Sequence, residues 1–249
     1  MTRRRFYAPP DAFAPDGARV ELSEEESRHL RDVLRLRAGE EAYVFDGEGR
    51  EFACIVSETG GRRGGARLEV RGRAEPPSPE SPLTLTLAVA LLKGEKFDLV
   101  VQKATELGVH AFVPVVTARA DVRLRDERDT TRRVERWRRL ALEASKQSGR
   151  ARLPLVHAPQ AFDAFTLQTQ GPLRLLFAER GGSGLGSLPD AERVVTALVG
   201  PEGGWEDEEL ARARERGWTL VTLGGRTLRA ETAAIAVCAL LQHSFGDLK

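Results

Sequence analysis

The chain has 249 residues, of which 41% are hydrophobic and 30% are charged, with 38 Lys and Arg against 37 Asp and Glu. This composition excludes a disordered tail and a fibrous protein. A chain of this length buries roughly 70–75% of the surface that it exposes when unfolded, so it needs no disulfide or metal ion to fold. It accommodates one large domain or two small ones.

The two cysteines, Cys54 and Cys238, lie far apart in the sequence, and the N-terminal Met-Thr-Arg-Arg-Arg is not followed by the apolar segment of a secretory signal. We therefore expect a reducing, cytoplasmic location. No run of residues approaches the roughly 18 apolar positions of a membrane span. The four histidines have no metal-ligand spacing, so we expect neither a membrane segment nor a metal site.

Basic residues gather in two places, although the net charge is only +1. Arg3, Arg4 and Arg5 open the chain, and residues 119–152 hold 12 Lys or Arg against 6 Asp or Glu. Such clusters favour a polyanionic partner, and the Arg guanidinium suits phosphate well. An equally good explanation is that Arg replaces Lys as the ordinary surface cation, since only 5 of the 38 basic residues are Lys.

The first 72 residues are predicted to form a small β-barrel or sheet. Short alternating strands are expected at Glu41–Phe45, Glu51–Val56 and Ala66–Val70. The dipeptide Asp46-Gly47 between the first two strands indicates a hairpin. Ser23 and Glu26 form a capping-box pattern, which predicts one short helix. The four prolines of residues 73–82 forbid regular structure, so this segment is predicted to be a linker.

Residues 83–249 alternate apolar runs with amphipathic segments, a βαβ rhythm that predicts an α/β domain with a parallel sheet. The expected strands are Leu83–Leu91, Phe112–Val116, Leu173–Ala178, Val194–Val199 and Thr219–Leu223. The expected helices are Phe97–Leu107, Arg132–Lys146, Glu206–Arg216 and Glu231–His243. The last helix is apolar on nearly every side, so we expect it to be buried in the core or in a subunit interface.

Two glycine-bearing loops, Gly200–Gly204 and Gly224–Thr232, each follow a predicted strand and precede a predicted helix. Ligands of an open α/β sheet bind where such loops lie, and glycine lets the backbone approach a flat ligand closely. One such loop alone is more simply a tight turn, but two loops after strands of one sheet favour a ligand site. They match neither a dinucleotide nor a triphosphate loop pattern, and no Gly-x-Ser-x-Gly or Cys–His motif indicates covalent hydrolysis.

These loops resemble the S-adenosylmethionine site of the SPOUT methyltransferases. More narrowly they resemble that of the RsmE family, which methylates N3 of a uridine in the 16S ribosomal RNA of the small subunit. The likeness continues in order through Arg4–Tyr7, His29–Arg35, Phe45–Gly47, Lys93–Lys96, Gln102–Gly108, Gln147–Arg150 and Phe245–Asp247. Lys146 departs from the family pattern, because an acidic residue is expected at that position.

The resemblance implies a PUA-like RNA-binding β-barrel over residues 1–72, a linker over 73–82, and a SPOUT methyltransferase domain with a C-terminal trefoil knot over 83–249. It also implies a homodimer with the closing helix near the partner subunit. The implied cofactor is S-adenosyl-L-methionine, held by Phe177, Ala178, Glu179, Leu198, Val199, Gly200, Pro201, Glu202, Gly203, Gly204, Leu223, Gly224, Gly225, Leu228, Arg229 and Thr232.

The N3 of uridine must lose its proton during methyl transfer, so a guanidinium that opposes the negative charge of the base is useful. Arg229 is the first catalytic candidate and Arg226 the second. Glu231 or Glu202 accepts the proton or, as we favour, holds an arginine in place. RNA contacts are expected from Arg3, Arg4, Arg5, Arg31, Arg35, Lys93, Lys96, Gln147 and Arg150.

Two other functions are compatible with these residues. One is a SPOUT methyltransferase that acts on another RNA, such as a ribose 2′-hydroxyl of transfer RNA, because the loop motifs discriminate poorly between a base nitrogen and an oxygen. The other is a non-catalytic RNA-binding assembly factor that keeps the fold. S-adenosylmethionine binding together with methyl transfer to RNA separates these functions.

Overall fold

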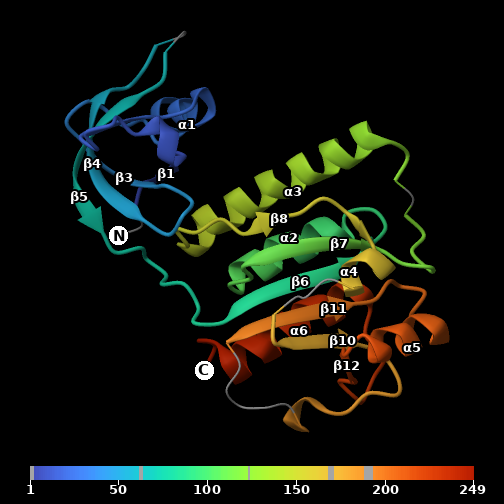
Figure 1. Cartoon of the computed structure of the whole chain (residues 1–249). Helices are drawn as coiled ribbons and strands as arrows, with labels where there is room; N and C mark the ends of the chain where they lie inside the picture. The colour runs from blue at the N-terminus through green and yellow to red at the C-terminus, as the bar shows by residue number, and fades with distance from the viewer. Residues whose placement is uncertain (1–2, 62–63, 123, 168–170, 188–192) are drawn as a thin grey trace. The chain divides into compact units, whose positions relative to one another are not determined.

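The computed structural model describes residues 3–61, 64–122, 124–167, 171–187 and 193–249 (Figure 1). The chain divides into two compact units. Unit 1 comprises Met1–Glu80 and Ser145–Leu153, and unit 2 comprises Ser81–Ala144 and Pro154–Lys249. The second segment of unit 1 comes from the middle of the sequence, which composition and motif spacing do not reveal. The expected linker over residues 73–82 is wrong at its start, because Arg73 and Ala74 pair with the strand residues Phe52 and Glu51, and a linker over the remainder stays a prediction.

Unit 1 contains a five-stranded sheet with the strand order β1-β3-β4-β5-β2. The strands are β1 (Arg5–Tyr7), β2 (Arg19–Glu21), β3 (Glu41–Phe45), β4 (Glu51–Glu58) and β5 (Arg67–Ala74). β1 pairs with β3 in parallel, whereas the other neighbours are antiparallel. The sheet curls into a half-barrel around an apolar cluster that includes Phe6, Leu30 and Leu68 (Figure 1). The predicted hairpin between β3 and β4 is confirmed.

One short helical segment, α1 (Glu24–Arg28), lies between β2 and β3 and continues into a π-helical turn, η2 (His29–Val33). A single 3-10 turn, η1 (Pro10–Ala12), precedes β2. The backbone N–H of Glu26 donates to the Ser23 hydroxyl at 3.2 Å, as the capping pattern predicts. Two residues after η2, Arg35 has a φ of 53°. This left-handed conformation costs a non-glycine residue roughly 1–2 kcal/mol.

Unit 2 contains a seven-stranded parallel sheet, which confirms the predicted α/β class. The path runs β12-β10-β11-β6-β7-β8, and β9 also pairs with β7. The strands are β6 (Thr84–Ala90), β7 (Ala111–Val116), β8 (Leu155–Val156), β9 (Gln160–Ala161), β10 (Leu173–Phe177), β11 (Val194–Val199) and β12 (Thr219–Val221). β12 ends two residues before the predicted end, so Leu223 lies in a loop. The trefoil knot stays a prediction.

The helices of the α/β region are α2 (Lys96–Glu106), α3 (Glu127–Ser148), α4 (Phe162–Leu167), α5 (Asp207–Glu215) and α6 (Ala230–Phe245), with a 3-10 turn, η3 (Leu185–Ser187). The final residues of α3, from Ser145, belong to unit 1. α6 is buried on one side in the core of unit 2, and its Leu240 is 38% exposed, so burial of its other side in a subunit interface stays a prediction. Within the described ranges, no helix is both long enough and apolar enough to cross a bilayer.

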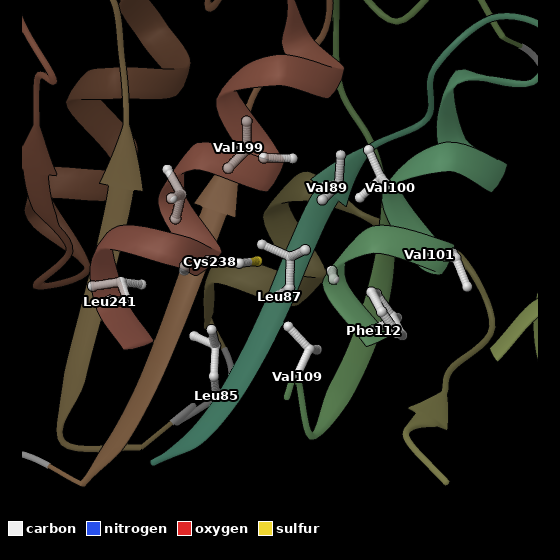
Figure 2. Close-up of a cluster of buried hydrophobic side chains, with 14 of the residues drawn as sticks. Leu85, Leu87, Val89, Val100, Val101, Val109, Phe112, Val199, Cys238 and Leu241 are labelled. Atoms are coloured by element: carbon white, nitrogen blue, oxygen red, sulfur yellow. The ribbon is translucent and has the colours of Figure 1, made fainter. Parts of the chain in front are cut away.

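The core of unit 2 lies on both faces of its sheet, because successive strand side chains point in opposite directions. Leu85, Leu87 and Val89 of β6 belong to a cluster with side chains of α2, α3 and α6. Figure 2 shows Cys238 of α6 among these side chains, close to Leu87. Leu198 of β11 instead joins a second cluster with α4 and α5. The sheet is therefore held between two helical layers, which leaves the ends of its strands to carry a site.

Candidate functional site

Strands β10, β11 and β12 end level with one another. Phe177 of β10 is in register with Val199 of β11 and with Val221 of β12. Because the three strands are parallel, the segments that follow them leave the same edge of the sheet. These segments enclose a cleft of about 720 Å³. This volume is typical of a small-molecule site.

The loop after β11 is tightly packed, and glycine is required at two of its positions. A β-carbon at Gly200 would lie 2.8 Å from the indole of Trp205, which is buried. The Trp205 Nε1–H in turn donates to the Phe177 carbonyl at 2.9 Å. Gly204 has a φ of 70°, and a β-carbon there would lie 3.0 Å from the Glu179 Oε1. The end of β10 therefore fixes the shape of this loop.

The loop after β12 leads directly into α6. Gly224 and Gly225 have φ values of 74° and 70° and are surrounded by open space, so their backbone conformation, not packing, requires glycine. Arg229 is the N-cap of α6, and its side chain makes no capping hydrogen bond. Helix N-caps favour Ser, Thr, Asp and Asn, and a helix N-terminus disfavours positive charge. Arg229 breaks both preferences, which indicates a functional role.

The cations of the cleft differ in their partners. Arg226 and Arg229 line the cleft and are exposed, and their side chains form no hydrogen bond or ion pair with any residue that the structure describes. The Nζ of Lys96 instead lies 3.0 Å from Glu202 Oε1 and 3.8 Å from Glu231 Oε2. This arrangement corrects the expectation that Glu202 or Glu231 holds an arginine, since both carboxylates face a lysine.

Most residues expected to hold the cofactor line this cleft, although their roles stay predictions. They are Phe177, Ala178, Glu179, Val199, Gly200, Pro201, Glu202, Gly203, Gly204, Leu223, Gly224, Gly225, Leu228 and Arg229. Leu198 is not among them, because its side chain is fully buried among the side chains of α4 and α5. Thr232 is exposed outside the lining. The lining also includes residues that were not expected to hold the cofactor, namely Lys96, Trp205, Thr222, Arg226, Thr227, Ala230 and Ala233.

Two arginines that were expected to bind RNA are buried in unit 1. Arg5 is 8% exposed, and its guanidinium donates to Glu51 Oε2 at 2.7 Å and to the carbonyls of Lys146 and Arg150 at 3.1 and 3.0 Å. Arg150 is 4% exposed and pairs with Glu80 at 2.7 Å. The structure corrects both expectations, because these guanidinium groups hold together the interior of unit 1.

Lys146, the departure from the family pattern, also has a partner inside unit 1. Its Nζ lies 2.8 Å from Glu26 Oε1, and the two side chains are only 13% and 6% exposed. A buried cation of this kind is retained only where a nearby anion offsets its desolvation. Glu26 therefore accounts for the lysine at this position.

Apart from Lys96, which was also expected to bind RNA and instead pairs with Glu202 and Glu231, the other residues expected to bind RNA remain accessible. Arg4, Arg31 and Lys93 form ion pairs with Glu40, Asp32 and Asp121, and Arg3 contacts Glu51 and the face of Tyr43. The pairs of Arg4, Arg31 and Lys93 lie at the surface and are weak, so these cations can exchange partners for phosphate, whereas Arg3 is partly held by the buried Glu51. Gln147 and Arg35 are exposed, and Arg35 has no partner among the described residues. Within the basic segment 119–152, Arg123 lies outside the described residues.

Neither cysteine is suited to nucleophilic chemistry. Burial raises the pKa of the Cys54 thiol to about 12 and also raises the pKa of Cys238. Both thiols are therefore protonated at neutral pH, and only the thiolate is a good nucleophile. The described parts of the chain contain no group of three or more His, Cys, Asp or Glu side chains placed to hold a metal ion.

Comparison with known proteins identifies the class of this chain. Residues 79–242 match the family model of the RNA methyltransferase domain, and residues 22–64 match that of the RNA methyltransferase PUA domain. The chain therefore combines the two domains of a class of RNA methyltransferases.

More specific matches define the family. Proteins named ribosomal RNA small subunit methyltransferase E from Synechocystis and Bacillus subtilis are 36% and 29% identical to this chain. These alignments cover 96% and 89% of this chain and 77% and 89% of the relatives. The chain belongs to the family of ribosomal RNA small subunit methyltransferase E, which confirms the resemblance seen in its sequence.

Two solved structures extend the likeness to the whole fold. Ribosomal RNA small subunit methyltransferase E from Neisseria gonorrhoeae, bound to S-adenosylmethionine, has a TM-score of 0.88 at 32% identity. A methyltransferase from Legionella pneumophila in complex with the same cofactor has a TM-score of 0.90 at 31% identity. Both alignments cover 100% of each chain.

Proposed function

We propose that this chain transfers a methyl group from S-adenosylmethionine to N3 of a uridine in the 16S ribosomal RNA of the small subunit. The observation that carries the proposal is the cleft, in which two glycine loops meet beside Arg226 and Arg229. The names of the relatives and the cofactor bound in two similar structures support the same activity.

The residues of the cleft fit the flat nucleoside part of S-adenosylmethionine. Glycine loops leave backbone amides and carbonyls accessible, while Phe177, Leu223 and Leu228 supply apolar surface. The close contact between Gly200 and Trp205 keeps the β11 loop in one shape. When bound, S-adenosylmethionine supplies an electrophilic methyl group on its sulfonium.

Arg229 supplies the charge that the target base requires. Uridine N3 loses its proton to water, and the negative charge of the deprotonated base spreads over the neighbouring oxygens. N3 then forms its bond to the methyl carbon while the carbon–sulfur bond breaks and its electron pair returns to sulfur. A guanidinium is always protonated and offers several N–H donors, so Arg229 stabilises the deprotonated base. Each unit by which the pKa of N3 falls is worth about 1.36 kcal/mol. Alignment of nitrogen, methyl carbon and sulfur supplies further acceleration.

RNA binding is assigned to the accessible polar residues Arg3, Arg4, Arg31, Arg35, Lys93 and Gln147. Phosphate contacts give an affinity that falls steeply with salt concentration, because binding releases counterions. We expect the logarithm of RNA affinity to fall linearly with the logarithm of salt concentration in a filter-binding titration. A flat response would exclude this electrostatic model.

We also propose that the chain works as a homodimer, with the trefoil knot that its family implies, and that it acts in the cytoplasm on ribosomal RNA. The support for a dimer is α6, a largely apolar helix that leaves Leu240 38% exposed. The replacement Leu240→Arg is expected to shift the sedimentation of the protein from dimer to monomer. A wild-type protein that sediments as a monomer would contradict the proposal.

The decisive experiment incubates the protein with isotopically labelled S-adenosylmethionine and small ribosomal subunits, followed by mass analysis of the nucleosides. Labelled 3-methyluridine is expected from the wild type and a much lower yield from Arg229→Ala. A labelled 2′-O-methyl nucleoside would instead support the ribose-methylating alternative. RNA binding without methyl transfer would support the assembly-factor alternative.

A further inference from the structure

Three charged side chains from three different elements meet beside the cleft, between its two glycine loops. Lys96 is the first residue of α2, Glu202 lies in the loop after β11, and Glu231 is in the first turn of α6. The Lys96 Nζ lies within 4 Å of both carboxylates. The backbone N–H of Lys93, just before α2, also donates to Glu202 Oε1 at 3.4 Å. We call Lys96, Glu202 and Glu231 the lysine clasp.

Because Glu202 and Glu231 are partly buried, their negative charges need the nearby charge of Lys96 to offset the loss of water. The side chains of Glu202 and Glu231 are 22% and 12% exposed. Glu231 Oε2 is buried without a hydrogen-bond partner, so the charge of Lys96 and the N-terminus of α6 are what offset its desolvation. Burial alone would raise the pKa of Glu202, but hydrogen bonds from Lys96 and from backbone amides hold that pKa below its ordinary value. Glu202 is therefore ionised at neutral pH.

We propose that Lys96 is a positioning residue, which holds the two glycine loops in the arrangement that binds the cofactor. It acts through Glu202 and Glu231, and its charge is not directed to RNA. The identity of the ligand rests on the proposed function, whereas the link between the loops does not depend on it.

Lys96 can hold the two glycine loops together because its two partners lie in different parts of the chain. Glu202 belongs to the β11 loop, and Glu231 follows the β12 loop directly, so one ammonium group joins both walls of the cleft. Because both carboxylate oxygens lie within 4 Å of one nitrogen, they lie less than 8 Å apart. Without Lys96 the two negative charges repel each other in a partly buried setting, where screening by water is weak. The loops then separate, and cofactor binding has to bring them back together.

The first test follows hydrogen–deuterium exchange in the protein without cofactor. Lys96→Met is expected to speed amide exchange about tenfold in both residues 200–204 and residues 224–231, because the coupling between the elements is lost. Lys96→Arg keeps the charge and should stay close to the wild type. Lys103→Met is the matched control, since Lys103 lies on the same helix and pairs with Glu106 at 2.9 Å. Exchange that is unchanged in either loop of Lys96→Met would overturn the proposal.

The second test measures S-adenosylmethionine affinity by calorimetry in a double-mutant cycle. Lys96→Met is expected to weaken binding about tenfold in the wild type but only about threefold or less in the Glu202→Gln background, where one of the repelling charges is gone. Equal losses in the two backgrounds would mean that Lys96 contacts the ligand directly, which overturns the positioning role. Glu202→Gln alone also tests the link if Lys96→Met does not fold, because faster exchange is then expected in residues 200–204.

The two tests separate this proposal from the proposed function. A wild-type protein that does not bind S-adenosylmethionine would refute the function, while the exchange experiment would still decide whether the clasp joins the loops. Unchanged exchange in an active Lys96→Met enzyme would refute the clasp and leave the function intact.

Discussion

Arg5 in unit 1 and Arg229 at the cleft of unit 2 are the same residue type in opposite settings. Arg5 is buried, and Glu51 and backbone carbonyls occupy its guanidinium. Arg229 is exposed and occupies a helix N-cap that disfavours its charge, and its side chain has no partner among the described residues. The first cation stabilises the fold, whereas the second remains available to a ligand. The comparison shows that burial and partners, not residue type, separate structural from functional arginines.

The largest expected effect is a loss of stability when the buried Arg5 is replaced. Arg5→Met removes the nearer of the two cations that face the buried carboxylate of Glu51 and leaves only Arg3 at 3.4 Å, so the free energy of unfolding should fall by about 3–5 kcal/mol. Denaturant unfolding monitored by circular dichroism measures this change in the free energy of unfolding. Arg71→Met is the matched control in the same unit, because Arg71 pairs with the exposed Glu69, and should cost less than about 1 kcal/mol. Similar losses for both variants would contradict the assignment.

For Arg229, the comparison predicts a loss of activity. Arg229→Ala should lower single-turnover methyl transfer by about 100-fold, because a positioned cation opposite the developing charge is lost. Its S-adenosylmethionine affinity, measured by calorimetry, should stay within about threefold of the wild type, since ground-state binding does not need this charge. Comparable losses of turnover and affinity would make Arg229 a binding residue.

A smaller effect, on cofactor affinity, is expected when Gly200 is replaced. The added methyl group of Gly200→Ala would overlap the Trp205 indole, so this variant should bind S-adenosylmethionine about tenfold more weakly by calorimetry. Gly224→Ala meets open space and bears only the cost of a left-handed backbone, about 1–2 kcal/mol of unfolding free energy. Binding by Gly200→Ala that equals the wild type would show that the contact with Trp205 does not shape the site.

The smallest effect concerns Arg35, an exposed and unpaired arginine with a left-handed backbone. Arg35→Gly should raise the free energy of unfolding by about 0.5–1 kcal/mol, because glycine adopts this conformation without strain. RNA affinity should fall severalfold in the same variant, since one phosphate contact is lost. Arg35→Lys keeps both the charge and the strain and serves as the control. A variant that loses stability would show that the arginine side chain supports the fold.

The success of the sequence predictions depended on how local each signal was. The long apolar strands and the two glycine loops were found, because each is visible in a short stretch of sequence. The two-residue strands β8 and β9 and the short helix α4 were not found, since they are too short to show a period.

The ion-pair partners of the charged residues were the feature that the sequence predicted least well. Arg5 meets Glu51, and Lys96 meets Glu202 more than a hundred residues further along the chain. No local pattern connects such residues, so their accessibility could be known only from the fold. The burial of Arg5 and Arg150 and the pairing of Lys96 were therefore missed.

The division of unit 1 between two stretches of sequence has a consequence for how the protein is made. Residues 1–80 lack the carbonyls that accept from Arg5 and the lysine that pairs with Glu26, because both come from Ser145–Leu153. During synthesis on the ribosome, more than sixty residues must therefore be added after Glu80 before the segment that completes unit 1 is made. A nascent chain halted before residue 145 already holds the whole buried apolar cluster of unit 1, from Phe6 to Leu68, but it lacks these polar partners of Arg5 and Glu26.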